Sequence, residues 1–142
     1  MTENISLSFT LNLAYPIFFT EHVFDLDNLL LSKLIIRNCK QVSCLVYIDQ
    51  NVDCNTQNLQ QYIVRYFEKQ LFVSLSAPPY VIKGGEACKN DPALLQQLYK
   101  EMLDSGIDRH SCIIAIGGGA LLDLVGYAAA TVHRGIPLIR IP

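Results

Sequence analysis

The chain has 142 residues, 51% hydrophobic and 17% charged, a composition in the range of soluble globular proteins and a length sufficient for one domain with a real core. Its net charge of -2, its pI near 5.8 and its dispersed basic residues give no electrostatic footprint for nucleic acid. No apolar run approaches the length needed to cross a bilayer, so we expect a cytoplasmic protein with neither nucleic acid nor a membrane as partner.

The N-terminal part is predicted to form a β-hairpin followed by a helix. Residues 5–13 and 15–19 alternate or cluster β-forming side chains, which is typical of two paired strands. Polar capping side chains then precede residues 29–36, whose apolar positions have helical spacing and end at the cationic Arg37.

From residue 41 onward, strand and helix patterns alternate regularly. Short apolar runs predict strands at 44–48, 80–83, 112–116 and 138–141. Helical spacing predicts helices at 56–68, at 92–103 and through Ala130, and a turn is predicted at 49–51. This alternation indicates an α/β fold of the Rossmann-like type, with a parallel sheet and helices on both of its faces.

The most informative stretch is an apolar strand that ends in Gly117, Gly118 and Gly119 and continues as a helix. Glycines remove the Cβ atoms that would keep a ligand from the backbone, and the free N–H groups of a helix start attract anionic oxygens. The pattern therefore suits a nucleotide pyrophosphate, although the spacing is neither Gly-x-Gly-x-x-Gly nor a nucleoside triphosphate loop. A tight strand-to-helix turn without a ligand is the alternative.

Two earlier turns carry polar side chains just after predicted strands, at the edge where open α/β sheets bind ligands. Asp49 and Asn51 follow the first of these strands, and Glu86 and Lys89 follow the next after a pair of glycines. The two carboxylates would accept hydrogen bonds from ribose hydroxyls, or would serve as turn and capping residues. Asn51 is also typical of a turn, and Lys89 of a solvated surface.

Two charged residues accompany the last helix. Asp123 lies one turn into it among apolar residues, so we expect a buried carboxylate with a dedicated partner, or else an acid that answers the helix dipole. Arg134 follows the helix, and its guanidinium suits a phosphate or carboxylate of a substrate or the carbonyl end of the helix.

The cysteines and histidines favour neither disulfides nor a self-contained metal site. The five cysteines are odd in number and form no C-x-x-C pair, so reduced thiols are expected. The three histidines lie far apart in the sequence with no metal-binding spacing.

Four motifs, taken together, resemble those of one known protein family in their order and spacing. They are Asp-Gln-Asn-Val at 49–52, Gly-Gly-Glu-Ala-Cys-Lys at 84–89, the glycine turn and helix at 117–126, and Ala-Thr-Val-His-Arg-Gly-Ile-Pro at 130–137. Their order and spacing resemble the N-terminal domain of 3-dehydroquinate synthase and related sugar phosphate cyclases. The resemblance covers residues 40–142 well and the first 40 only in outline.

The resemblance implies that NAD is held in the crevice of this domain. Asp49 and Asn51 would lie near the adenosine, Glu86 and Lys89 beside the ribose, Gly117, Gly118 and Gly119 at the pyrophosphate, and Asp123 at the nicotinamide end. Arg134 would face the substrate. The family's enzymes are carbon-oxygen lyases that use NAD to oxidise a seven-carbon sugar phosphate, eliminate phosphate, reduce the ketone again and close a carbocycle by aldol addition, as in aromatic amino acid biosynthesis.

The same resemblance implies a domain organisation. Residues 1–142 would form the NAD-binding N-terminal domain, with 1–40 as hairpin and first helix and 41–142 as nucleotide-binding core. By the same resemblance, we expect the family's C-terminal helical domain, which binds a divalent metal such as zinc or cobalt, to be missing from this chain. We therefore expect catalysis and a homodimer of the full-length protein, and no turnover by this chain alone.

Several alternatives stay open. The residues at 133–135 and 139–142 resemble cyclases of sedoheptulose 7-phosphate, or divergent synthase-like members of accessory biosynthetic clusters, somewhat more than a shikimate-pathway enzyme. Dehydroquinate synthase is nevertheless the preferred broad assignment. An iron-dependent or glycerol-type alcohol dehydrogenase would share the fold, but the motifs at 84–89 and 133–137 favour a cyclase. A non-enzymatic nucleotide-binding remnant is the third possibility.

Overall fold

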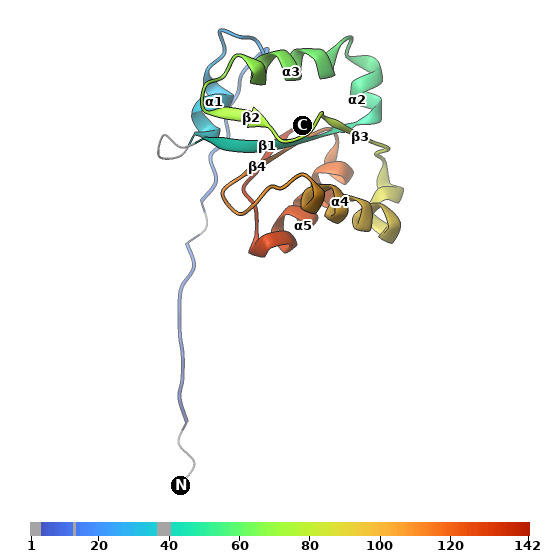
Figure 1. The fold of residues 1–142 in the computed structure, drawn as a ribbon. Helices are drawn as coiled ribbons and strands as arrows, with labels where there is room; N and C mark the ends of the chain where they lie inside the picture. Colours follow the sequence, from blue (N-terminus) through green and yellow to red (C-terminus); the bar gives the residue numbers. More distant parts are fainter. Residues whose placement is uncertain (1–3, 13, 37–40) are drawn as a thin grey trace.

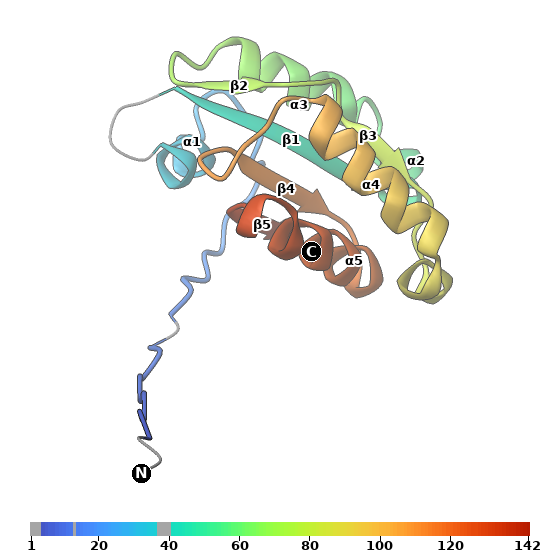
Figure 2. The same cartoon turned by 60° about the horizontal axis from the view of Figure 1, so that its bottom comes forward.

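A parallel five-stranded sheet forms the centre of the molecule. The computed structural model describes residues 4–12, 14–36 and 41–142. The strands are β1 (Val42–Asp49), β2 (Val73–Leu75), β3 (Tyr80–Ile82), β4 (Cys112–Ile116) and β5 (Leu138–Ile141). Their spatial order is β2-β1-β4-β5, and β3 pairs with the last residues of β1 on the side of β2. The long strand β1 is therefore the centre of the sheet, as Figure 2 shows.

Helices cover both faces of this sheet. Helices α1 (Leu30–Ile35), α2 (Gln50–Asn55) and α3 (Leu59–Glu68) lie on one side, and α4 (Pro92–Asp104) and α5 (Gly119–Thr131) lie on the other (Figure 1). The strands β1 and β4 are buried almost throughout, because alternate side chains enter two separate apolar cores. Two short 3-10 helices, η1 (Glu86–Asn90) and η2 (Val132–Arg134), complete the order of elements.

The α/β class and the alternation of elements predicted from residue 41 onward are confirmed. The predicted strands at 112–116 and 138–141 have the observed bounds, and the helix predicted at 92–103 is one residue longer. Two local predictions are wrong. The turn predicted at 49–51 is the start of α2, and the strand β2 was not predicted, because three residues are too few to show an alternating pattern.

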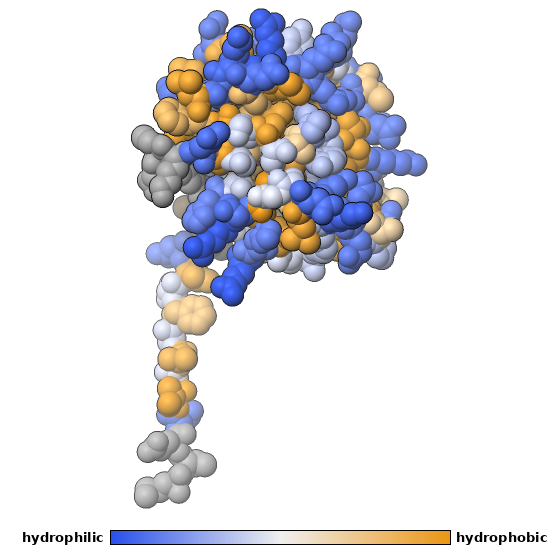
Figure 3. All heavy atoms as spheres, in the orientation of Figure 1, coloured by the Kyte–Doolittle hydropathy of each residue, from blue (hydrophilic) through white to orange (hydrophobic). Residues whose placement is uncertain are grey.

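The predicted N-terminal hairpin is also wrong for the residues that the structure describes. Residues 4–12 and 14–29 contain no strand, and Leu13 of the first predicted strand lies outside the described residues. Residues 4–12 and 14–19 extend away from the body of the molecule (Figure 1), with side chains such as Leu7 and Phe9 87% and 81% exposed. A hairpin by itself buries too little apolar surface to be stable, and no other element packs against this one. Apolar and polar side chains alternate along it in Figure 3.

Over residues 4–12, 14–36 and 41–142, no helix combines the length and the apolar character needed to span a bilayer.

Candidate functional site

The carboxyl ends of three adjacent strands meet at one edge of the sheet. Asp49 ends β1, and its register partner on β3 is Ile82, two residues before Gly84. On the other side, Ile48 is paired with Ile116 of β4, the residue before Gly117. The three turns that the sequence singled out are therefore neighbours in space, at the edge where open parallel sheets bind ligands.

Asp49 is the most buried polar residue of this edge, with 6% of its surface exposed. Its Oδ1 accepts a hydrogen bond of 2.8 Å from the backbone N–H of Asn51 and so caps the first turn of α2. No side chain or backbone donor of the described residues is bonded to Oδ2. One carboxylate oxygen is thus committed to the fold, and the other is free to accept a hydrogen bond from a ligand.

The glycine turn leaves open space beside a helix start. Gly117 is buried, whereas Gly118 and Gly119 are exposed, and a Cβ added to either of these two would meet no atom within 4 Å. Gly118 is the N-cap of α5, and no side chain caps this helix. The N–H groups of its first turn therefore point toward open space with a partial positive charge, which favours an anion.

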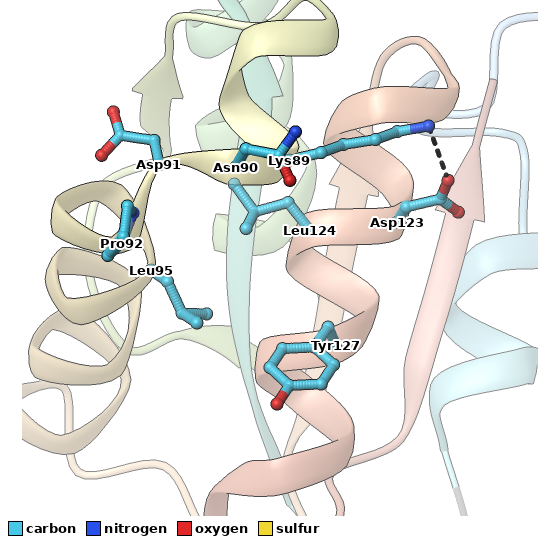
Figure 4. Close-up of a pocket in the computed structure, with 8 residues that line it drawn as sticks. All are labelled: Lys89, Asn90, Asp91, Pro92, Leu95, Asp123, Leu124 and Tyr127. Atoms are coloured by element: carbon cyan, nitrogen blue, oxygen red, sulfur yellow. Dashed lines mark ion pairs between the residues drawn. The ribbon is translucent and has the colours of Figure 1, made fainter.

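Lys89 joins two of the turns. Its Nζ lies 3.3 Å from Oε2 of Glu86 on η1. It also lies 3.3 Å from Oδ2 of Asp123 on α5, the ion pair drawn in Figure 4. The hydrogen bond to Asp123, followed by that to Glu86, raises the pKa of Lys89. Asp123 does have a dedicated partner, but the expectation that it is buried is wrong, since its side chain is 58% exposed. The apolar residues around it in sequence face the sheet, while Asp123 itself lies on the outer side of α5.

A groove with a volume of about 550 Å³ extends from this ion pair (Figure 4). One wall is the segment 89–92 with Leu95 of α4, and the other is Asp123, Leu124 and Tyr127 of α5. Tyr127 was not singled out from the sequence. Tyr127 is four residues after Asp123, so the two side chains lie on the same side of the helix. This spacing could have identified Tyr127 from the sequence.

Buried Cys88 lies near the carboxylates of this edge. Burial, followed by the charges of Asp49 and Glu86, raises the pKa of its thiol, so it is a poor nucleophile. The sequence placed this cysteine in the 84–89 motif but gave it no role.

Arg134 is not brought together with the other residues. It follows α5, a helix of 13 residues that begins at the glycine turn and spans roughly 20 Å. Arg134 therefore lies near the opposite edge of the sheet, exposed and with a left-handed backbone at φ 66°. Asn51 lies beside Asp49 with an exposed side chain, which makes no hydrogen bond to another described residue.

No group of three or more His, Cys, Asp or Glu side chains in the described part of the chain is placed to hold a metal ion.

The comparisons with known proteins concern the family and the fold. The family model described as 3-dehydroquinate synthase N-terminal matches residues 79–142. The 3-dehydroquinate synthase of Salinibacter ruber is 34% identical over 104 residues, which are 70% of this chain and 25% of that protein. The chain belongs to the 3-dehydroquinate synthase family, in its N-terminal part.

Solved structures of sugar phosphate cyclases have the same fold. A 2-deoxy-scyllo-inosose synthase complexed with carbaglucose-6-phosphate, NAD⁺ and Co²⁺ has a TM-score of 0.65 and 25% identity, over 86% of this chain and 30% of that one. The 2-epi-5-epi-valiolone synthase of Streptomyces hygroscopicus subsp. jinggangensis, with NAD⁺ and Zn²⁺ bound, has a TM-score of 0.75 over 96% of this chain and 34% of its own, and at 24% identity it supports the fold alone. The chain spans about a quarter or less of the length of the curated relatives that it matches.

Proposed function

We propose that this chain binds NAD at the carboxyl edge of its sheet, as the N-terminal part of a 3-dehydroquinate synthase-like sugar phosphate cyclase. The observation that carries the proposal is that two polar features lie side by side, at the ends of the adjacent strands β4 and β1. An uncapped helix start with open space at Gly118 and Gly119 lies beside a buried carboxylate, Asp49, that has one unpaired oxygen. The first suits a pyrophosphate and the second a ribose hydroxyl, which are the groups that a dinucleotide presents together.

The remaining residues would hold the rest of the cofactor. Asp49 and Asn51 are proposed at the adenosine end, the glycines at the pyrophosphate, and Glu86 and Lys89 at a ribose. Asp123 is proposed at the nicotinamide end, because its ion pair with Lys89 opens onto the groove of about 550 Å³. The half-exposed ion pair costs little to rearrange, so Lys89 and Asp123 can exchange part of their mutual contact for hydrogen bonds to a ligand.

For the whole protein we propose the cyclase reaction of the family, a carbon-oxygen lyase step on a seven-carbon sugar phosphate. NAD, when bound, supplies reversible hydride transfer at a secondary alcohol of the substrate. The part carried by these residues is binding: the glycine turn fixes the pyrophosphate, and Asp49 orients the adenosine. The described residues offer no donor set for the zinc or cobalt ion found in the related structures, so we derive no metal-dependent step from them. Turnover is not expected of these residues alone.

Arg134 remains the proposed substrate-binding residue, but only for a substrate that another copy of the chain holds. Its distance from the glycine turn along α5 makes it unsuitable for a ligand held by the same chain. A homodimer, which is the proposed assembly of the full-length protein, would allow Arg134 of one copy to approach the substrate of the other.

Isothermal titration of NAD into the purified chain tests the proposal. Gly118→Val places a branched side chain in the open space over the helix start and is expected to abolish binding, while Asp123→Ala should weaken it. Asp104→Ala is the matched control, since it removes an exposed carboxylate at the far end of α4. Equal heats for wild type and Gly118→Val would contradict the pyrophosphate assignment. No binding to a folded wild-type chain would favour a remnant without nucleotide.

A further inference from the structure

Two buried cysteines lie opposite each other on adjacent central strands. Cys44 of β1 and Cys112 of β4 are register partners in the parallel ladder. Their exposed fractions are 0% and 4%, and both side chains belong to the apolar core on the side of α1 and α3. Neighbouring strands lie about 4.8 Å apart, so the Cα atoms of such a pair have a separation within the range of about 4.4–6.8 Å that disulfides need.

The two thiols also interact with each other. A hydrogen bond between the side chains of Cys44 and Cys112 is the largest cause that raises the pKa of Cys44, and burial is the second. Cys112 in turn donates a hydrogen bond of 3.7 Å to the carbonyl of Ile113. The other described cysteines are not placed to interfere, since Cys54 is exposed and Cys88 belongs to the core on the opposite face of the sheet. Cys44 and Cys112 are therefore a close pair of free thiols.

A short helix covers the end of the sheet at which this pair lies. Cys44 is near the start of β1 and Cys112 is the first residue of β4, and Figure 2 shows α1 beside these ends of the two strands. Leu31 and Ile35 of α1 belong to the same core as the thiols. A helix of six residues is marginal by itself, so local opening of α1 gives a small oxidant access to the pair. The raised pKa of Cys44 keeps its thiolate scarce, and oxidation is therefore slow.

We propose that Cys44 and Cys112 form a reversible redox site, which a peroxide converts into a disulfide between β1 and β4. The thiolate of Cys112 attacks one oxygen of hydrogen peroxide, and the O–O bond breaks. This step leaves a sulfenic acid on Cys112 and a hydroxide, which takes up the proton that the thiol has lost. The sulfur of Cys44 then displaces hydroxide from the sulfenic sulfur, and its proton leaves in a second water. Two thiols and one peroxide thus give one disulfide and two waters, and a thiol reductant reverses the change by exchange.

The disulfide acts on the stability of the fold. It closes a loop between residues 44 and 112, which removes extended conformations from the unfolded chain. For a loop of this length and a chain of 142 residues, we expect the melting temperature of the oxidised protein to be higher by about 5–15 °C. The two cysteines lie toward the amino ends of their strands, whereas the candidate site lies at the carboxyl ends. This inference therefore does not rest on the proposed function.

Oxidation of the folded chain by hydrogen peroxide tests the proposal. After the incubation, the remaining thiols are alkylated in denaturant, and disulfides are identified by mass spectrometry of peptides. Two peptides linked through Cys44 and Cys112 are expected, together lighter than the reduced peptides by two hydrogen atoms, and the melting temperature should rise as given above. Dithiothreitol should reverse both changes. Cys54→Ala is the matched control, because it removes an exposed thiol that is not part of the pair and should leave both results unchanged.

Two variants separate the disulfide from other effects of peroxide. Cys44→Ala and Cys112→Ala each remove one partner, so the linked peptides and the rise in melting temperature on oxidation should both disappear. If a variant does not fold, the peptides of the wild type decide by themselves. The proposal is overturned if both thiols of the folded wild type remain free to react with the alkylating reagent, if they pair with other cysteines, or if they are oxidised to sulfinic acids instead. It is also overturned if oxidation raises the melting temperature of Cys44→Ala as much as that of the wild type.

Discussion

Two tyrosines that are both fully buried differ in whether their hydroxyl groups are hydrogen bonded. The hydroxyl of Tyr66 accepts a bond of 3.0 Å from the N–H of Ser32, in the first turn of α1, and donates one of 3.4 Å to the carbonyl of Asn28. The hydroxyl of Tyr47 has no partner among the described residues, and neither has the nearby Oε2 of Glu101. Burial, followed by the negative charge of Glu101, raises the pKa of Tyr47, so its hydroxyl stays neutral.

Replacing each tyrosine by phenylalanine should therefore have opposite effects. Tyr66→Phe leaves the buried N–H of Ser32 without an acceptor, which costs about 1–3 kcal/mol. For a chain of this length, that corresponds to a melting temperature lower by about 3–10 °C. Tyr47→Phe removes a buried hydroxyl that makes no bond and keeps the stacking on Tyr80, at a ring separation of 5.6 Å. Its expected effect is between none and a gain of about 1 kcal/mol, or about 3 °C.

Thermal and urea unfolding of the two variants, each checked for a single transition by two spectroscopic probes, measures the difference. Each variant serves as the control for the other, because the change of atoms is the same and both sites are fully buried. A loss of stability in Tyr47→Phe equal to that in Tyr66→Phe would refute the reasoning and would mean that the Tyr47 hydroxyl bonds to Glu101 in solution.

Three further predictions concern charge and exposed surface. A hydrogen bond from the backbone N–H of His110 is the largest cause that lowers the pKa of Asp108 in the folded protein. The ionised Asp108 therefore stabilises the fold above the ordinary carboxyl pKa near 4, and this stabilisation is lost as the pH falls through the lower pKa of the folded state. The urea midpoint of Asp108→Asn should accordingly depend less on pH between about 2 and 5 than that of the wild type. Lys89→Met should leave the melting temperature nearly unchanged, since its ion pairs are largely exposed, and should weaken NAD binding by calorimetry; a large fall in melting temperature with unchanged affinity would contradict its assignment to the site. The exposed side chains of Leu7 and Phe9 should promote self-association, so serine at both positions should lower the mean mass measured by light scattering at high protein concentration, and an unchanged mass would count against this view.

Secondary structure was predicted most reliably from the sequence where the local residue pattern and the tertiary packing favour the same element. The apolar run at 112–116 is a strand because both of its faces are covered, and Pro92 begins α4 behind the capping carboxylate of Asp91. It was least reliable where stability needs a distant partner. The alternating residues of the N-terminal segment predict strands, but a strand forms only where another strand accepts its hydrogen bonds and a core accepts its side chains.

By itself, the sequence determined the α/β class, the order of most strands and helices, and the presence of polar turns after three strands, because these depend on residues that are neighbours in the chain. Only the tertiary structure decided that Asp49 lies between Gly84 and Gly117 and that Asp123 is exposed and paired with Lys89. The place of Asp49 follows from the sheet order, in which β1 lies between β3 and β4. The pairing that sets this order joins residues more than thirty positions apart in the chain, which no local pattern records.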